Sequence, residues 1–247
     1  MTPTLGGLLD PSQVAAFFLV LARVSPLFLL APLFSSTSVP GRVRGIVAVA
    51  LAVGLSPIAA RGADIPLDTW SLGGLVAKEL LVGAGFAFAV GAVFAAVQVA
   101  GTLLDTFVGF SFGGLVDPMT GVQSSVMAQL YTMVGLLVFI AIGGDAWVIE
   151  GLARTYGSIG ITELPSLTET VGETVEAFAA IFAGALQVAA PVLLAVILTD
   201  AAFGLVSRVV PQLNVFAIGF PAKVTVGLLT ASASLPFLAQ WLQGRLI

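Results

Sequence analysis

The sequence contains neither cysteine nor histidine. Without cysteine there can be no disulfide, no thiolate nucleophile and no cysteine-ligated iron–sulfur cluster. Without histidine the chain lacks the most common metal ligand and the most common general base. Its serines have no histidine to activate them, and its acidic residues are not clustered with metal-ligand spacing. We therefore expect no catalytic site, no metal site and no cofactor, and a protein that is not an enzyme.

Charge is also scarce. Only 9% of the residues are charged and 58% are hydrophobic, whereas a typical globular chain carries about 25% charged residues. The net charge of −4 and the lack of a basic block argue against a nucleic-acid partner. Too little polar surface remains to coat a soluble domain of this size. Most of the exterior is therefore expected to face lipid or apolar protein neighbours.

The uncharged residues are grouped in long apolar runs. A helix that crosses about 30 Å of hydrocarbon needs about 20 apolar residues. The stretch 209–222 contains Pro211 and Pro221 and is not expected to form one straight spanning helix. The sequence predicts an all-α, polytopic integral membrane protein that forms one compact helical unit. Its apolar segments are residues 13–34, 46–60 (a short one), 80–104, 122–144, 177–199 and 224–244.

The connecting stretches differ in charge. Residues 35–45 read as a turn that contains Arg42 and Arg44, and the positive-inside tendency makes it the best cytoplasmic candidate. Residues 61–79 are mixed in charge, and residues 145–176 form the longest polar stretch. The first thirteen residues carry no lysine or arginine, so they are not expected to act as a cleaved signal peptide.

The third apolar segment carries small residues at a spacing of four: Gly83, Ala87, Gly91 and Ala95. On a helix these positions share one face. Small residues let another backbone approach closely, as in contacts between membrane helices. We expect a close helix contact on this face, either within the chain or with another subunit. The other explanation is that a chain rich in alanine and glycine produces such spacings by chance.

Several charges lie in or near apolar segments, where each costs roughly 2.5–3.5 kcal/mol to insert. One hypothesis is an ion or proton path lined by Asp105 and Asp200. The favoured interpretation places the charges at helix ends, in interfacial loops or in buried pairs, such as Asp200 with Arg208. Arg23 needs a carboxylate or carbonyl partner, or a position outside the lipid. The candidates are Arg23, Asp105, Asp117, Asp200, Arg208 and Lys223.

The stretch between the third and fourth apolar segments is apolar but broken by glycines, and it ends in the turn signal Asp117-Pro118. Non-helical backbone at membrane depth is tolerated only where protein buries it or where it lines a cavity. We therefore predict a loop packed inside an assembly, at a pore; the alternative is an ordinary re-entrant turn. The residues of this predicted plug or pore loop are Gly109, Phe110, Ser111, Phe112, Gly113, Gly114, Leu115, Val116, Asp117 and Pro118.

Several motifs, in order along the chain, resemble the FliR/SctT family of type III secretion export-gate subunits. The most specific is the one near the C-terminus, which includes Pro211, Gln212, Asn214, Phe216, Gly219, Phe220 and Pro221. The motifs are Arg23-Val-Ser-Pro26, Val39-Pro40-Gly-Arg42-Val-Arg44, Gly109-Phe-Ser-Phe112, Val116-Asp117-Pro118, Gly143-Gly144-Asp145 and Val210-Pro211-Gln212-Leu213-Asn214-Val215-Phe216-Ala217-Ile218-Gly219-Phe220-Pro221.

The resemblance implies a subunit that joins FliP and FliQ in a ring-like export gate in the bacterial inner membrane, as part of the flagellar basal body. It implies FlhB as a further partner and unfolded exported proteins as cargo. Residues 109–117 would form the plug that closes the channel. Residues 1–176 would be a FliP-like part and residues 177–247 a FliQ-like hairpin. The alternative function is an ion-coupled secondary transporter that uses Asp105 and Asp200 as a relay.

Overall fold

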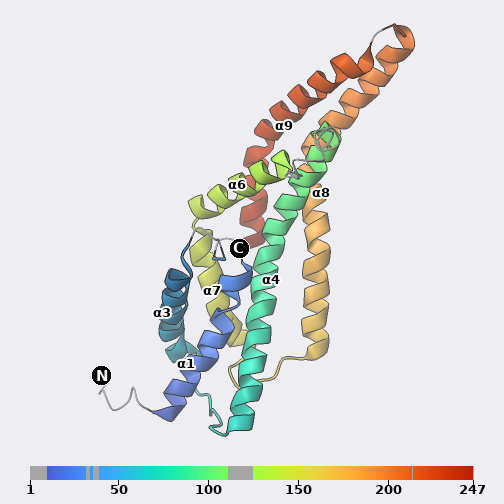
Figure 1. The fold of residues 1–247 in the computed structure, drawn as a ribbon. Helices are drawn as coiled ribbons and strands as arrows, with labels where there is room; N and C mark the ends of the chain where they lie inside the picture. Colours follow the sequence, from blue (N-terminus) through green and yellow to red (C-terminus); the bar gives the residue numbers. More distant parts are fainter. Residues whose placement is uncertain (1–9, 32–33, 36–38, 111–124, 213, 247) are drawn as a thin grey trace, which may run out of the picture. The chain divides into compact units, whose positions relative to one another are not determined.

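The computed structural model describes residues 10–31, 34–35, 39–110, 125–212 and 214–246. The secondary structure in these residues is helical, which confirms the all-α prediction (Figure 1). The helices are α1 (Pro11–Val24), α2 (Leu27–Leu30), α3 (Gly41–Ala59), α4 (Thr69–Val108), α6 (Val126–Ala141), α7 (Gly144–Ser158), α8 (Leu167–Val209) and α9 (Val215–Leu246).

Five stretches of the described helices are long and apolar enough to cross a membrane. A sixth candidate is the pair α6 and α7, which is bent by 73°. The chain is therefore a multi-pass membrane protein by the length and composition of its helices. The five stretches are Pro11–Leu30, Gly41–Ala59, Thr69–Val108, Thr170–Val209 and Ala217–Arg245.

Two helices are much longer than the apolar runs that predicted them. Helix α4 has 40 residues and α8 has 43. At its N-terminal end α4 continues through Lys78 and Glu79, because a charged residue ends an apolar run without breaking a helix. Helix α4 begins after Asp68, whose carboxylate accepts a hydrogen bond from the Ser71 backbone N–H at 2.9 Å. This hydrogen bond lowers the pKa of Asp68, so the cap is weakened only when the carboxylate is protonated in acid.

Two predicted connecting stretches, 35–45 and 145–176, are partly helical. Arg42 and Arg44 lie in the first turn of α3, which follows Pro40, and α3 has 19 residues, so the second segment is not short. Helix α7 covers much of the predicted polar loop 145–176. Its hydropathy is low because it is amphipathic: Val148, Leu152 and Tyr156 are buried at a spacing of four, and charged residues such as Glu150 and Arg154 are exposed.

Two glycines shape the bend between α6 and α7. Gly143 adopts φ 72°, a left-handed conformation that favours glycine. A side chain on Gly144 would come within 2.4 Å of the Phe139 ring. Phe139 is fully buried and packs edge-on against Phe94 with ring centroids 5.2 Å apart, so its ring has little room to move. The Gly143-Gly144 pair is thus required by backbone geometry and by packing.

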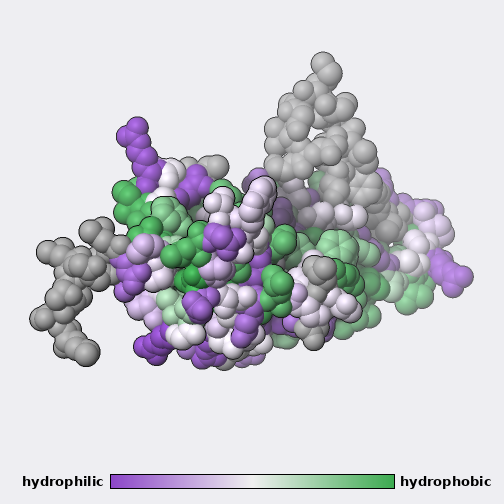
Figure 2. All heavy atoms as spheres, turned by 90° about the horizontal axis from the view of Figure 1, so that it is seen from below, coloured by the Kyte–Doolittle hydropathy of each residue, from purple (hydrophilic) through white to green (hydrophobic). Residues whose placement is uncertain are grey.

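The chain divides into two compact units. The first comprises Met1–Gly91 and Asp145–Ala177, and the second comprises Ala92–Gly144 and Phe178–Ile247. In the first unit α1 packs against α3. The surface seen in Figure 2 carries hydrophilic residues interspersed with hydrophobic ones. Loop 60–68 between α3 and α4 contributes exposed charges, among them Arg61 and Asp64.

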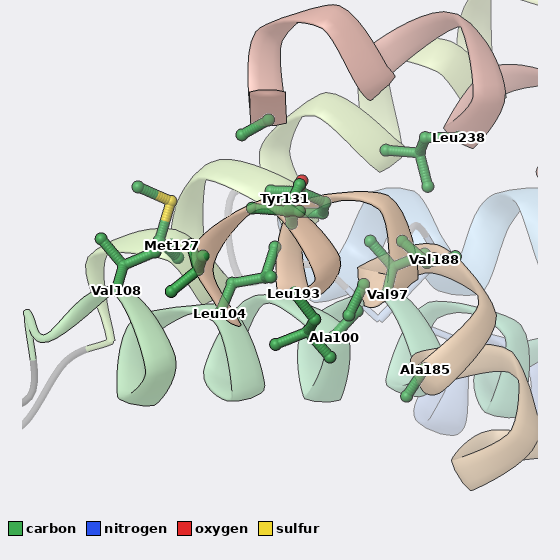
Figure 3. Packing of buried hydrophobic residues seen from close by; sticks show 14 of the residues in the cluster. Val97, Ala100, Leu104, Val108, Met127, Tyr131, Ala185, Val188, Leu193 and Leu238 are labelled. Atoms are coloured by element: carbon green, nitrogen blue, oxygen red, sulfur yellow. The ribbon is translucent and has the colours of Figure 1, made fainter. Parts of the chain in front are cut away.

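The second unit has a core built from four helices. Helices α4 and α8 contribute apolar residues at helical spacing, and α6 and α9 close the cluster around Tyr131 (Figure 3). Helices α8 and α9 form a hairpin. The buried members of the cluster are Val97, Ala100, Leu104, Val108, Met127, Tyr131, Ala185, Val188, Ala189, Val192, Leu193, Val196, Ala231, Leu238 and Leu242.

Candidate functional site

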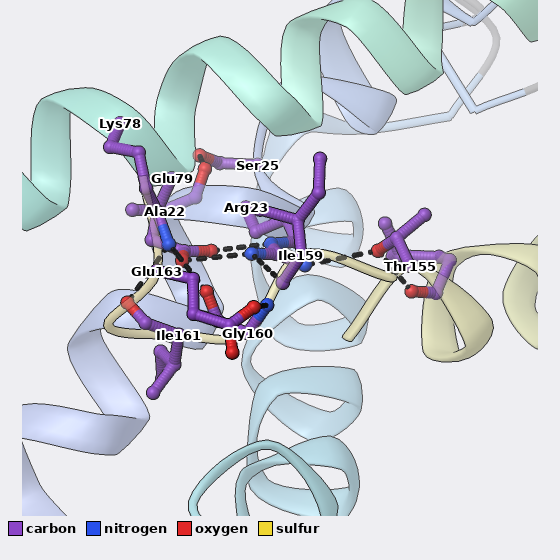
Figure 4. A network of polar contacts seen from close by, with 11 residues as sticks. Ala22, Arg23, Ser25, Lys78, Glu79, Thr155, Ile159, Gly160, Ile161 and Glu163 are labelled. Carbon is purple, nitrogen blue, oxygen red and sulfur yellow. Dashed lines mark hydrogen bonds and ion pairs between the residues drawn. The ribbon is translucent and has the colours of Figure 1, made fainter. Parts of the chain in front are cut away.

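Arg23 lies at the centre of a buried polar network in the first unit (Figure 4). Its guanidinium faces the Glu79 carboxylate with two nitrogens: Nε donates to Oε2, and Nη2 donates to Oε1 at 2.9 Å. Both side chains are fully buried. The guanidinium also stacks on the ring of Tyr156, 4.1 Å from its centroid. Arg23 therefore has the carboxylate partner that its place in an apolar segment requires.

The network also ties the connection between α7 and α8 to the helices. Arg23 donates to the Ile159 carbonyl at 3.0 Å and to the Thr155 hydroxyl at 3.2 Å. Lys78, which is 5% exposed, forms an ion pair with Glu79 and donates to the carbonyls of Gly160 and Ile161 at 2.8 and 2.9 Å. Two cations thus share one carboxylate, and backbone carbonyls and the Thr155 hydroxyl accept their other hydrogen bonds.

Burying such an ionic network costs free energy, and removing one of its members also costs free energy. Taking charges out of water costs several kcal/mol per ion, and only good geometry with satisfied hydrogen bonds offsets that cost. Here the bonds come from α1, α4, α7 and the segment after α7, so the cluster forms only when all four segments are in place. Its charged groups bind one another and the protein backbone, which points to a role in positioning these segments.

Sequence reasoning missed Lys78 and Glu79 because they were assigned to the mixed-charge loop 61–79. The signal that could have found Glu79 is the small-residue spacing itself. Glu79 lies four residues before Gly83, so it continues the line of the small residues on one face of α4. A charge on the contact face of a membrane helix indicates a buried partner, and Arg23 is the charge within the first apolar segment.

Two of the four small residues of α4, Gly83 and Gly91, lie near the first segment of the same chain. A Cβ on Gly83 would come within 2.1 Å of the Arg23 carbonyl oxygen, so the two backbones are in direct contact there. Ala87 is fully buried. A Cβ on Gly91 would lie 3.7 Å from the Leu30 carbonyl oxygen, which is an ordinary van der Waals distance. Ala95 is half-buried in the second unit.

Asp105 has a structural partner in the second unit. Its carboxylate accepts a hydrogen bond from the Met127 backbone N–H at 3.2 Å, at the first turn of α6. One turn earlier on α4, a Cβ on Gly101 would come within 2.4 Å of the Ala128 Cα. Ser125 caps α6 through its hydroxyl, which accepts from the Ala128 N–H at 3.1 Å. These contacts hold the end of α4 against the start of α6.

The predicted plug loop is described only at its beginning. Gly109 ends α4 with φ 104°, and its N–H donates to the Asp105 carbonyl at 3.1 Å. Phe110 packs against the core of the second unit. The other predicted plug residues, Ser111, Phe112, Gly113, Gly114, Leu115, Val116, Asp117 and Pro118, lie outside the described residues.

The C-terminal motif forms the turn between α8 and α9. Helix α8 ends at Val209, and Pro211 and Gln212 are exposed in the turn. Asn214 caps α9, because its side-chain oxygen accepts from the Ala217 N–H at 3.1 Å. Phe216 and Gly219 lie in the first turns of α9 with Phe220 and Pro221, which are exposed. The motif thus combines a proline that follows α8 with an asparagine that starts α9.

The prediction that Asp200 pairs with Arg208 is wrong. Asp200 on α8 accepts from Lys223 on α9 at 2.8 Å, and Arg208 is exposed near the end of α8. The reason is the antiparallel hairpin: it brings Lys223 opposite Asp200, whereas Arg208 lies eight residues further along the same helix. Both side chains are partly exposed, 50% for Asp200 and 22% for Lys223. Within the described chain, no group of three or more acidic side chains gathers as a metal site would require.

The fold and these contacts define a multi-pass helical membrane protein with two internal helix contacts made through glycine. A profile of the family described as "Bacterial export proteins, family 1" matches residues 14–246. The chain is 31% identical to the flagellar biosynthetic protein FliR of Escherichia coli K12, over 92% of this chain and 87% of that protein. It is 33% identical to FliR of Bacillus subtilis 168, over 85% and 82%.

A third relative comes from a different export system. The surface presentation of antigens protein SpaR of Salmonella typhimurium is 28% identical, over 87% of this chain and 81% of SpaR. The chain belongs to the FliR family of bacterial export proteins, and it is a component of a type III secretion export apparatus.

Proposed function

We propose that this chain is the FliR-type subunit of a flagellar protein export gate. With FliP and FliQ it forms the channel through which unfolded flagellar subunits cross the inner membrane, at the base of the flagellum. The observation that carries the proposal is the family match, which extends over residues 14–246 and includes the turn between α8 and α9. FliR relatives match over more than four fifths of their own length.

The flagellar assignment is preferred over a virulence-type injectisome. The relatives named FliR in Escherichia coli and Bacillus subtilis are 31% and 33% identical, and SpaR of Salmonella typhimurium is 28% identical. We infer that the exported cargo consists of flagellar subunits and that FlhB is a further partner of the gate. The chain itself acts as a channel component and performs no reaction.

The exposed apolar surface of the hairpin supports an assembly with apolar partners. Near the turn between α8 and α9, Ile197, Leu205 and Val209 are 50%, 65% and 81% exposed. On a membrane protein, large apolar side chains exposed in this way indicate contacts with protein or lipid. In the proposed gate, helices of FliP and FliQ cover this part of the hairpin.

Residues 109–118 are proposed to close the channel. The anchoring of the flanks supports this role: Phe110 packs into the core of the second unit, and Asp105 and Ser125 bind the start of α6. A loop that must withstand opening and closing benefits from rigid ends. Gly109, in its left-handed conformation, directs the chain away from the axis of α4.

The alternative, a transporter with Asp105 and Asp200 as proton relay, has less support. Asp105 accepts a backbone hydrogen bond from Met127, and Asp200 is paired with Lys223. A relay carboxylate needs to exchange protons along a continuous path. Each of these carboxylates instead has a partner that explains its position.

Co-expression with FliP and FliQ tests the proposal. The chain, tagged at one end, is purified in detergent together with both proteins, and the intact complex is weighed by native mass spectrometry. We expect a single complex that contains all three proteins in fixed proportion. A chain that purifies free of both partners, while FliP and FliQ assemble with each other, would contradict the proposal.

A further inference from the structure

The first unit contains a trough of about 710 Å³ between α4, α7 and the first turns of α8. This volume lies within the roughly 300–1,000 Å³ of typical small-molecule sites. Its α4 wall is apolar and includes Val82, Phe86 and Phe88. The buried ion network adjoins it at Thr155 and Ile159, but the hydrogen bonds of that network are already used within the protein. That network therefore leaves the trough open to a separate ligand.

Helix α8 turns its polar side toward the trough. Thr170, Glu173 and Thr174 line it, at the spacing of one helix face. Beside them on the same turns, Val171 and Val175 are 60% and 63% exposed. The start of α8 thus lines the trough with polar and charged side chains and exposes apolar ones next to it. Such a boundary suits a ligand that has both a polar and an apolar part.

The polar rim carries charges of both signs. Arg154 comes from α7, Glu163 from the segment before α8, and Glu173 from α8. Arg154 binds Glu150, but this pair is 76% and 59% exposed and contributes at most about 1 kcal/mol. Its guanidinium is available to a phosphate, with which arginine forms paired charge-assisted hydrogen bonds. Glu163 accepts a hydrogen bond from the Gly160 N–H at 3.0 Å, and a carboxylate has further lone pairs. Together with Glu173 it therefore suits a cation that donates several hydrogen bonds.

Exposed apolar side chains border the trough. Leu81 and Leu164 line it and are 65% and 80% exposed. The trough also lies where an apolar span begins, at Thr170. An occupant with a dipolar head and long apolar chains matches both features, because its head can stay at the level of the interface while its chains leave over the leucines.

We propose that the trough binds a phospholipid with an ethanolamine-type head group. The phosphate binds Arg154, the primary ammonium binds Glu163 and Glu173, and the acyl chains lie along Leu81, Phe88 and Leu164. A choline head group keeps the charges but has no N–H to donate, and a glycerol head group has no cation. The trough therefore discriminates between head groups of otherwise similar lipids.

The test uses the full chain, purified in detergent and stripped of co-purified lipid. Phosphatidylethanolamine, phosphatidylcholine and phosphatidylglycerol of identical acyl chains are added separately, and bound lipid is measured by native mass spectrometry. We expect phosphatidylethanolamine to bind about tenfold more tightly than either of the others. Equal binding of the three lipids, or tightest binding of phosphatidylglycerol, would overturn the proposal, and neither result depends on a variant.

Two glutamates of α8 provide a matched pair of variants. Glu173→Gln is expected to lower the affinity for phosphatidylethanolamine about tenfold, because it removes one carboxylate from the trough. Glu176→Gln, on the same helix but outside the trough, is expected to leave the affinity unchanged. Identical affinities for the two variants would contradict the site. Phosphoethanolamine without acyl chains should compete only weakly, and full competition would assign the site to a soluble ligand.

Discussion

Arg23 and Glu79 are 56 positions apart in the sequence and form a fully buried ion pair between α1 and α4. One turn along α4, Gly83 touches the backbone of Arg23 itself. The two contacts depend on each other, since only a glycine lets the helices approach closely enough for Glu79 to reach the guanidinium. The ion pair and the small residue are therefore one structural device that fixes the first segment on α4.

Removing the carboxylate from this device is expected to destabilise the first unit strongly. Glu79→Gln leaves Arg23 and Lys78 as buried cations without an anion, and breaking a buried pair in this way costs about 3–5 kcal/mol. The free energy of unfolding, measured by denaturant titration in detergent, tests this. Glu150→Gln breaks the exposed pair with Arg154 and is the control, with an expected loss of at most about 1 kcal/mol. Equal losses for the two variants would refute the role assigned to Glu79.

Adding one methyl group to Gly83 is expected to force α1 and α4 apart. A Cβ there would lie 2.1 Å from the Arg23 carbonyl oxygen, and backbone cannot yield as a flexible side chain can. Gly83→Ala should lower the free energy of unfolding by about 1–3 kcal/mol, the usual cost of overpacking.

Substitutions at two other glycines of α4 serve as comparisons for Gly83→Ala. Gly74 has open space around it, so Gly74→Ala should be neutral or stabilise by up to about 1 kcal/mol, because alanine favours the helix. At Gly91 the nearest atom is 3.7 Å from a new Cβ, so alanine should fit and Gly91→Leu should not. We expect Gly91→Leu to weaken co-purification with FliP. Destabilisation by Gly74→Ala equal to that by Gly83→Ala would contradict the close contact.

Asp200 and Lys223 should behave as a partly exposed pair and not as a proton relay. Asp200→Asn and Lys223→Gln each remove the same contact, so both should leave export of flagellar proteins largely intact. The measurement is the amount of exported protein in the culture medium. If Asp200→Asn abolishes export with the gate assembled and Lys223→Gln does not, the aspartate carries protons and the structural interpretation fails.

Deleting residues 109–114 is expected to open the channel. In the proposed gate this segment occludes the pore, so an assembled complex without it should conduct ions in a planar bilayer while the complete complex should not. The comparison is a mild substitution within the same segment, Phe110→Leu, which keeps an apolar residue against the core and should leave the channel closed. Unchanged conductance after the deletion would show that the loop does not seal the pore.

The sequence alone was sufficient for the fold class and for the family. Long charge-free runs predicted membrane helices, and they do so reliably because hydrocarbon tolerates few alternatives to a helix. The same method placed the helix ends badly. Hydropathy places α7 in a loop, because an amphipathic helix has low mean hydropathy. The spacing of four between Val148, Leu152 and Tyr156 indicates a helix instead.

The polar contacts could be predicted only in part. The requirement that Arg23 have a partner follows from the cost of a charge in an apolar segment. Hydropathy places Glu79 and Lys78 in a loop, and only the spacing of the small residues on α4 points to Glu79. The partner of Asp200 was named wrongly, since pairing depends on the register of the hairpin, which a single sequence does not contain. The contact of Asp105 with Met127 depends likewise on how α4 meets α6.

The central claim, that this chain is a necessary part of a flagellar export gate, is tested most directly by secretion. In the bacterium that encodes it, the gene is deleted and flagellar hook and filament proteins are measured in the medium and in the cells. We predict that both proteins disappear from the medium, remain inside the cells, and return to the medium when the complete chain is supplied from a plasmid. Continued secretion of hook and filament proteins by the deletion strain would contradict the account.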